Sequence, residues 1–307
     1  MNHTEKPNLM APDTPTAGHT PRVLIVGSDG QLGAALSRYL ASNGYDVQAT
    51  TRRAARTDAR TFLFDLERPS FDFTNTSYDC VIVCAGLTSI AACERDPPLC
   101  ERVNVTNTIA LIEHFAARRS FIIFLSSTAV FDGSKAFYRF DDVPNPTTVY
   151  GRAKLAVEIY IREKHKDRAA TLRITKVISE TTPFIESWLK DSKDGKPISA
   201  YTNRLISPVT IASVCDAVQL LAERKQGGVY QLGGDEEVTF FDFAHRHFAG
   251  DQKKLGLITA TEDKSTLVTS STHNSLATYL PTKEPQYDIL LHERRVSMGL
   301  MLSLILI

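Results

Sequence analysis

The sequence lacks an excess of either charge, a recognisable set of metal ligands and a hydrophobic run long enough to cross a bilayer. Its 307 residues carry 35 basic and 35 acidic side chains, so the net charge is zero. This balance removes the electrostatic attraction that would make nucleic acid or an anionic membrane the main partner. The eight histidines form no ligand cluster, and no metal site is expected.

Cysteine is scarce and unpatterned. Five cysteines are an odd number, and none has the CxxC spacing of a zinc site. Cys80 and Cys84 lie in an apolar run, where a free thiol packs as a small hydrophobe. The sequence therefore predicts a reducing, cytoplasmic environment.

The two ends of the chain differ from the rest. Residues 1–20 contain proline and threonine without an apolar core, which predicts a disordered leader rather than a signal peptide or anchor. Residues 298–307, MGLMLSLILI, are apolar but about half as long as a membrane span. A final strand or helix docked on the core is the expectation for this run.

From residue 22 onward, short β-branched runs alternate with longer helical stretches. RVLIVG, YDVQATT, TFLF, DCVIVCAG, SFIIFLSS and ATLRITKVIS read as strands, and helices are expected between them, including one over residues 98–117. Continuous apolar strands separated by helices indicate an α/β fold with a doubly wound parallel sheet of the Rossmann type. Residues 21–178 are expected to form it, with 206–231 returning to it, and 179–205 with 232–307 to form a smaller C-terminal substrate lobe.

A glycine-rich turn follows the first strand and opens a helix. Gly27, Gly30 and Gly33 have the spacing G-x-x-G-x-x-G. Glycines at such a turn let a pyrophosphate approach the free N–H groups at the start of a helix. The second strand then ends in Arg52 and Arg53, where NAD-specific proteins place an acidic residue for the ribose 2′-hydroxyl. Guanidinium groups favour a 2′-phosphate, so NADP(H) is expected in preference to NAD(H).

Three Tyr-x-x-x-Lys matches compete as a catalytic pair, so the motif alone does not select one. Tyr279 and Lys283 have a proline between them, which disfavours a helical turn. Tyr160 and Lys164 lie about 280° further around the helix that begins near Tyr150. Only Tyr150 and Lys154 open a helix after a strand that ends in hydroxyl residues, and Ser127 stands 23 residues before Tyr150. A nearby ammonium lowers the pKa of a phenol, and a hydroxyl can polarise a carbonyl, which together suit reduction by a nicotinamide.

FIIFLSSTAVFDG followed by VYGRAK resembles the extended short-chain dehydrogenase/reductases, in particular the sugar-nucleotide reductases similar to dTDP-4-dehydrorhamnose reductase. LTSIAACERDPPLCERVNVTNT is similar to the segment after strand four of that family and GGVYQLGG to a later strand, so the likeness covers about residues 22–245. The resemblance implies that Tyr150 is the proton donor, Lys154 its partner and ribose ligand, and Ser127 the catalytic hydroxyl, with Thr128 as the alternate.

The resemblance also implies a set of cofactor contacts. Asp65 would lie near the adenine amine, the Cys84–Gly86 turn under the ribose, Thr88 near the nicotinamide or substrate, and Asn104 would hold the active-site helix or a water. The expected cofactor-binding residues are Gly27, Asp29, Gly30, Gln31, Leu32, Gly33, Arg52, Arg53, Asp65, Leu66, Cys84, Ala85, Gly86, Thr88, Asn104, Tyr150 and Lys154.

Several functions remain open within the resemblance. Thr128-Ala129 replaces the Asp-Glu pair that a 4,6-dehydratase would need. An NADPH-dependent reductase of a keto-sugar nucleotide fits the residues best, and a homodimer is an expectation that no residue pattern decides. The alternatives are a sugar-nucleotide epimerase or dehydrogenase, and a non-catalytic NADP-binding regulatory subunit similar to that of methionine adenosyltransferase.

Overall fold

A parallel sheet organises the chain. The computed structural model describes residues 19–71, 76–264 and 273–281. Within these residues, seven strands pair in the order β11-β6-β5-β4-β1-β2-β3, and all neighbours in this sheet are parallel. They are β1 (Arg22–Val26), β2 (Asp46–Thr51), β3 (Thr61–Leu63), β4 (Cys80–Val83), β5 (Phe121–Ser127), β6 (Ala169–Ile174) and β11 (Gly228–Leu232). The predicted doubly wound sheet is confirmed.

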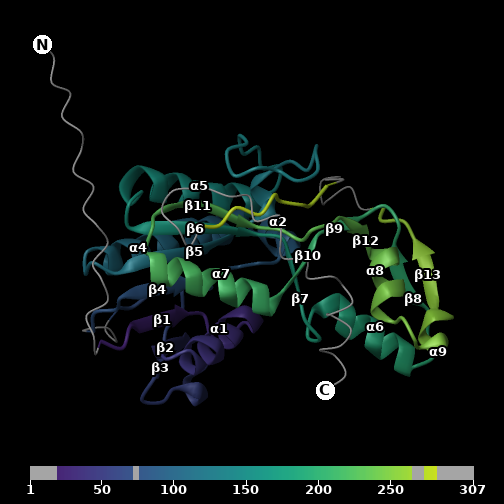
Figure 1. Ribbon diagram of the computed structural model, residues 1–307, viewed down its shortest axis with the longest axis horizontal. Helices are drawn as coiled ribbons and strands as arrows, with labels where there is room; N and C mark the ends of the chain where they lie inside the picture. The colour runs from purple at the N-terminus through teal and green to yellow at the C-terminus, as the bar shows by residue number, and fades with distance from the viewer. Residues whose placement is uncertain (1–18, 72–75, 265–272, 282–307) are drawn as a thin grey trace, which may run out of the picture.

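Helices cover both faces of the sheet (Figure 1). On one face lie α1 (Gln31–Ser42) and α7 (Ile211–Arg224), and on the other lie α4 (Thr108–Ala116) and α5 (Val149–Lys164). Alternate residues of β5 therefore enter different cores: Ile123 packs with α1 and α7, and Ile122 packs with α4 and α5. Burial on both faces explains why the strands are apolar throughout.

The strand order reverses between β1 and β4. The chain runs outward from β1 through β2 to β3 and then crosses back to β4 on the other side of β1. In open α/β sheets, the crevice at the carboxyl ends of the strands beside such a reversal is where ligands bind. The glycine turn after β1 and the Cys84–Gly86 turn after β4 both lie at this crevice.

The helix expected over residues 98–117 is divided into three parts. After α2 (Ile90–Arg95), the structure has α3 (Pro97–Glu101), a π-helical segment η2 (Arg102–Asn107) and then α4. Asp96 caps α3, its carboxylate accepting from the N–H of Leu99 at 3.0 Å. The apolar pattern did not reveal the π segment, which carries Asn104.

The described residues beyond β6 include a smaller lobe with its own core. Ile185, Trp188, Phe243 and Phe248 are buried together there. Its elements are α6 (Pro183–Lys193), β8 (Ile198–Tyr201), α8 (Phe240–His247), α9 (Gln252–Leu255) and β13 (Ile258–Thr261), and β8 pairs with β13. There are also two short strand pairs: β7 (Lys176–Ile178) pairs with β10 (Pro208–Thr210), and β9 (Leu205–Ile206) pairs with β12 (Val238–Thr239). Two 3-10 turns lie elsewhere in the chain, η1 (Ala54–Arg56) after β2 and η3 (Thr128–Val130) after β5.

The ends of the chain stay untested. Residues 1–18 of the expected leader and the apolar run 298–307 lie outside the described residues. Among the helices of the described ranges, none has the length and apolar character needed to span a membrane.

Candidate active site

The glycine turn brings three backbone segments into direct contact. Gly27 has a φ of +97°, which favours glycine, and a Cβ there would meet the backbone nitrogen of Ala85 at 2.8 Å. A Cβ on Gly33 would come within 2.3 Å of the carbonyl oxygen of Gly27. Gly30 differs, because its Cβ would meet only that same oxygen, at 3.6 Å. Gly27 and Gly33 are thus required by packing, whereas Gly30 keeps the outer side of the turn open.

The start of α1 has the character of an anion site. Gly30 caps the helix without a side-chain acceptor, so the first N–H groups of α1 have no capping partner. The Gln31 side chain donates instead to the hydroxyls of Ser179 and Thr181, and Leu32 packs against the core of α1 and α7. The helix dipole and these backbone groups suit the pyrophosphate of a dinucleotide.

Asp29 gathers the basic residues at the end of β2. Its carboxylate accepts from the Thr51 hydroxyl at 2.9 Å, from the Arg52 backbone N–H at 2.8 Å and from Arg56 at 3.4 Å, and Arg53 approaches it to 4.0 Å. Burial alone would raise the pKa of Asp29, but these hydrogen bonds and the two guanidinium charges hold it below its usual value. The motif search missed Arg56, which no spacing rule marked.

The crevice beside β3 and α4 holds the predicted adenosine contacts. The Asp65 carboxylate accepts from the N–H of Glu67 at 3.0 Å, and the carbonyl of the buried Leu66 accepts from Asn107 at 2.8 Å. Asp65 and Leu66 are therefore fixed in a turn that follows β3.

Asn104 shapes the turn after β4. Its side-chain amide donates to the carbonyl of Leu87 at 2.9 Å and accepts from the N–H of the same residue at 2.8 Å. Gly86 has a φ of +152°, and a Cβ there would lie 3.0 Å from the Asn104 oxygen. Thr88, which follows Leu87, is exposed. At the start of the same turn, burial raises the pKa of the Cys84 thiol to about 12. Asn104 thus positions the β4 turn, and the segment η2 that carries it packs against α5.

Ser127 and Tyr150 meet because α5 begins directly against the turn after β5. A Cβ on Gly151 would come within 2.0 Å of the carbonyl oxygen of Ala129, so only glycine permits this approach. Tyr150 is only 8% exposed. Burial raises the pKa of its phenol, and the nearby Ser127 hydroxyl partly offsets this rise.

Lys154 lies one turn further along α5. Its ammonium donates to the carbonyl of Leu125 at 2.9 Å and lies 5.8 Å from the centre of the Tyr150 ring. Burial lowers the pKa of Lys154 to about 8, and the carboxylate of Glu158 opposes that shift. Ser127, Tyr150 and Lys154 are thus brought together beside the glycine turn.

The other two Tyr-x-x-x-Lys matches do not form such a group. The Tyr160 hydroxyl donates to Glu113 at 2.7 Å on the outer side of α5. The ring of Tyr279 stacks on Phe140 with the ring centres 3.9 Å apart, and Lys283 lies outside the described residues.

The conserved pattern of the RmlD substrate binding domain matches residues 21–298. The chain belongs to the RmlD family. The resemblance predicted from the sequence, to extended short-chain dehydrogenase/reductases similar to dTDP-4-dehydrorhamnose reductase, is confirmed.

The relatives of this RmlD-family chain are named for more than one function. Methionine adenosyltransferase 2 subunit beta of Bos taurus is 28% identical over 234 residues, 73% of this chain and 70% of the relative. The spore coat polysaccharide biosynthesis protein SpsK of Bacillus subtilis is 25% identical over 273 residues, 88% of this chain and 89% of the relative. The crystal structure of dTDP-4-dehydrorhamnose reductase from Bacillus anthracis in complex with NADP shares the fold, with a TM-score of 0.72 at 19% identity, covering 84% of this chain and 91% of that one.

Residues distant in sequence complete this RmlD-family site. The hydroxyl of Thr128 donates to the side-chain oxygen of Asn274. Glu237 accepts from the backbone N–H of Asn274 and pairs with His273, both at 2.7 Å. The segment 273–281 thus lies beside the end of β5, although no sequence motif marked it.

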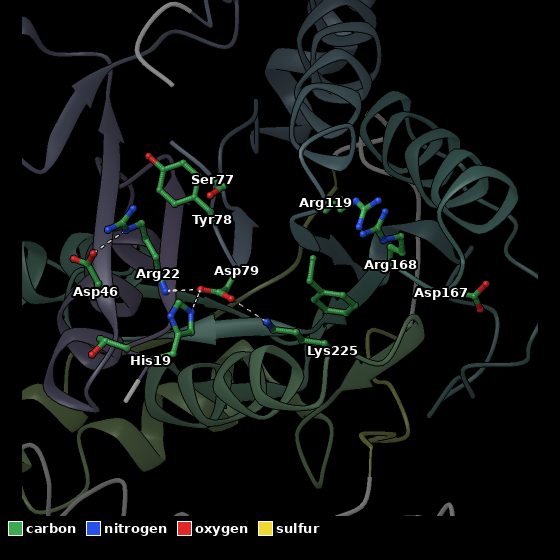
Figure 2. Close-up of a pocket in the computed structure, with 12 residues that line it drawn as sticks. His19, Arg22, Asp46, Ser77, Tyr78, Asp79, Arg119, Asp167, Arg168 and Lys225 are labelled. Carbon is green, nitrogen blue, oxygen red and sulfur yellow. Dashed lines mark hydrogen bonds and ion pairs between the residues drawn. The ribbon is translucent and has the colours of Figure 1, made fainter. Parts of the chain in front are cut away.

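A cavity of about 600 Å³ lies at the opposite edge of the sheet (Figure 2). It is lined by residues at the amino ends of strands, such as Arg22, Asp79 and Phe121. Phe121 and Ser127 are the two ends of β5, which a rise of about 3.3 Å per residue separates by roughly 20 Å. The C-termini of α4 and α7 lie on this side, and their dipoles disfavour an anionic dinucleotide there. Basic side chains in this cavity, such as Lys225 after α7, interact favourably with the negative end of a helix dipole.

Metal ligands are not gathered in the part of the chain that the structure describes. No group of three or more His, Cys, Asp or Glu side chains there has the arrangement of a metal site.

Proposed function

We propose that this chain is an NADP(H)-dependent oxidoreductase that reduces a keto-sugar nucleotide, as dTDP-4-dehydrorhamnose reductase does. The observation that carries the proposal is the placement of Ser127 beside the Tyr150 phenol, with Lys154 one turn along α5, at the same sheet edge as the glycine turn. Membership of the RmlD family supports the reductase class, and the similarity to SpsK, which is named for spore coat polysaccharide biosynthesis, supports a substrate from sugar metabolism.

The dinucleotide fits the residues present. The close contacts of Gly27 and Gly33 leave the turn free of side chains, and the uncapped start of α1 offers N–H groups to its pyrophosphate. When bound, the nicotinamide supplies a hydride to the substrate carbonyl carbon. Tyr150 donates its phenolic proton to the substrate oxygen, and Ser127 can turn its hydroxyl from the phenol to that oxygen. Lys154 holds the ribose and favours loss of the phenolic proton.

Substrate binding is assigned to the smaller lobe, residues 179–205 and 232–307. Its described residues between Phe184 and Ile258 share a core of their own, whereas Leu280 packs in the core of the main sheet. The Gln31 contacts to Ser179 and Thr181 join the first residues of the lobe to the glycine turn. A nucleotide sugar held between the lobe and the sheet edge would present its carbonyl to Tyr150. We keep the homodimer and the cytoplasmic location as predictions.

NADPH turnover with a panel of keto-sugar nucleotides tests this function. We expect loss of NADPH absorbance at 340 nm with at least one 4-keto-6-deoxy sugar nucleotide, and product carrying a new hydroxyl by mass spectrometry. If NADPH binds but no member of the panel is reduced, the reductase assignment is wrong.

Arg53 and Arg56 should decide the preference for NADPH. A 2′-phosphate would draw both guanidiniums away from Asp29, because charge-assisted bonds to phosphate are strong. Replacing both by glutamine should weaken NADPH binding about ten- to a hundredfold and leave NADH binding within about twofold. Fluorescence titration measures both constants. Arg60→Gln is the control, since Arg60 pairs with Asp46 at the amino end of β2, away from Asp29, and equal weakening of both cofactors would contradict the assignment.

A regulatory role is the second candidate, favoured by the 28% identity to methionine adenosyltransferase 2 subunit beta. Such a subunit would bind NADP(H) without turning over a sugar. The same panel separates the two functions when it is combined with a pull-down using methionine adenosyltransferase as the probe.

A further inference from the structure

A buried ion pair lies behind Lys154. Glu158 and Arg173 are 3% and 4% exposed. The Arg173 guanidinium donates to the Glu158 carboxylate at 2.7 Å through one Nη and at 3.1 Å through Nε. Removing two charges from water costs about as much as their attraction returns, so a buried pair is weak evidence for a gain in stability. Another role has to explain it.

The pair is aligned with the candidate catalytic residues. Tyr150, Lys154 and Glu158 are spaced four residues apart, which places them along one face of α5. The Ser126 hydroxyl donates to Glu158, and Lys154 donates to the carbonyl of Leu125. Adjacent residues of β5 thus hold the carboxylate and the ammonium.

Glu158 supplies the negative charge that opposes the effect of burial on Lys154. Besides this carboxylate, the groups that act on the ammonium are the thiols of Cys84, Cys93 and Cys100, after β4 and in α2 and α3. The phenol of Tyr150 is the other titratable group beside it. Since burial raises the pKa of the Cys84 and Cys93 thiols, these remain neutral near pH 7, and Glu158 is the carboxyl group among the neighbours of the ammonium.

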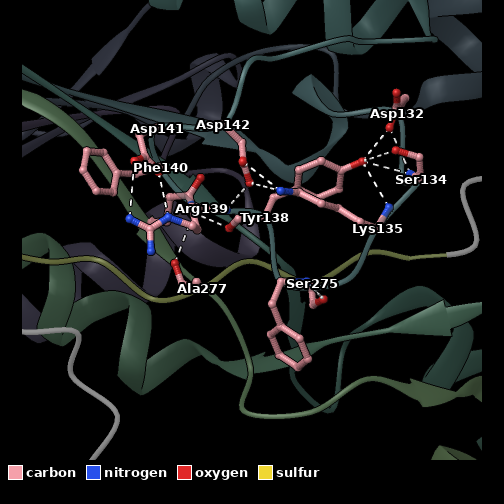
Figure 3. A network of polar contacts seen from close by, with 12 residues as sticks. Asp132, Ser134, Lys135, Tyr138, Arg139, Phe140, Asp141, Asp142, Ser275 and Ala277 are labelled. Atoms are coloured by element: carbon pink, nitrogen blue, oxygen red, sulfur yellow. Dashed lines mark hydrogen bonds and ion pairs between the residues drawn. The ribbon is translucent and has the colours of Figure 1, made fainter.

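Arg173 connects the pair to two outer segments. It donates to the carbonyl of Phe140 at 3.3 Å and to the side chain of Gln231 at 3.2 Å. Gln231 is fully buried and donates to the carbonyls of Tyr138 at 2.8 Å and Ala277 at 3.1 Å. Figure 3 shows the loop that holds Tyr138 and Phe140 lying beside the segment that holds Ser275 and Ala277. Arg173 is therefore fixed from several sides and can hold Glu158 in one orientation.

We propose that Glu158 and Arg173 are positioning residues for the proposed reductase site: Glu158 keeps the Lys154 ammonium charged and aimed at the cofactor ribose, and Arg173 fixes Glu158. The inference rests on the proposed function, since it gives Lys154 a cofactor to hold.

The pH dependence of NADPH binding tests the inference. Lys154 is charged below its pKa, so affinity for NADPH in the wild type should be full below pH 8 and fall as the pH rises through about 8. Glu158→Gln should move this fall to lower pH by about one unit, because a nearby opposite charge shifts a pKa by that amount or more. Fluorescence titration of the full chain with NADPH across pH 6–10 (about half-unit steps) measures it.

A second variant separates positioning from stability. Glu158→Met with Arg173→Met removes both charges at similar volume, which often leaves stability unchanged or higher. Its melting temperature should be at or above that of the wild type. Its affinity for NADPH should still fall at a lower pH than in the wild type, as in Glu158→Gln. Glu236→Gln, which breaks the exposed pair with Arg246, should leave the pH at which NADPH affinity falls unchanged.

The outcomes distinguish the two proposals. A wild type that binds no NADPH at any pH overturns the proposed function and this inference with it. If NADPH affinity of the wild type falls at alkaline pH and both Glu158 variants leave the pH of this fall unchanged, the inference alone is overturned.

Discussion

Replacing Tyr150 by phenylalanine should lower keto-sugar reduction by about a hundred- to ten-thousandfold, the usual contribution of a positioned proton donor. The ring would still fill its buried place among the residues of α2, α3 and α4, so the fold and NADPH binding should survive. The phenol is the group that meets the Ser127 hydroxyl, and without it a reduced carbonyl has no adjacent acid. Single-turnover oxidation of NADPH by substrate measures the loss.

Tyr160→Phe is the matched control, because it removes a phenol from the same helix and from the same Tyr-x-x-x-Lys pattern. Its hydroxyl contacts Glu113 and not the site, so turnover should stay within about twofold. Equal losses in the two variants, or full turnover by Tyr150→Phe, would remove Tyr150 from the mechanism.

Gly33→Ala should destabilise the fold by about 3 kcal/mol and abolish NADPH binding. Its Cβ would stand 2.3 Å from the Gly27 carbonyl, and both atoms belong to backbone that is packed between β1 and α1. Overpacking of this kind forces the backbone to move, at a cost of about 1–3 kcal/mol and sometimes more. Urea unfolding and NADPH titration measure the two effects.

Gly30→Ala tests whether the effect of Gly33→Ala is steric. The same methyl group at Gly30 meets the Gly27 oxygen at 3.6 Å, an ordinary contact, and Gly30 has a φ of −78° that alanine adopts freely. Stability should change by less than about 1 kcal/mol. If both alanine variants unfold at the same urea concentration, close packing at Gly33 is not what glycine provides there.

The order of elements and the choice among the Tyr-Lys pairs could be predicted from the sequence. Apolar runs separated by helical stretches predicted the parallel sheet, because burial of both strand faces leaves a composition that can be read locally. Tyr150 was selected by its place after a hydroxyl-tipped strand, and the structure brings it to Ser127. Both inferences depend on neighbours within one or two elements.

The contacts that support this site could not be read in the same way. These contacts depend on the path of the backbone in the folded chain. They include the ion pair of Arg56 with Asp29, the hydrogen bond of Asn104 with the β4 turn, and the π segment that carries Asn104. Asn104 is expected to hold the active-site helix or a water, and the structure adds a contact that the sequence does not mark, because the Asn104 side chain bonds both backbone groups of Leu87. The site assignments themselves remain predictions until the variants above are measured.

The sequence by itself determined the fold class, the glycine turn and the helix that carries Tyr150 and Lys154, because each is encoded by residues close together in the chain. Only the tertiary structure decided that Asn274 reaches Thr128 and that Arg173, from β6, pairs with Glu158. These partners lie 146 and 15 residues apart. Their side chains meet because the sheet stacks distant strand ends at one edge, and no periodicity or spacing records which of them will face each other.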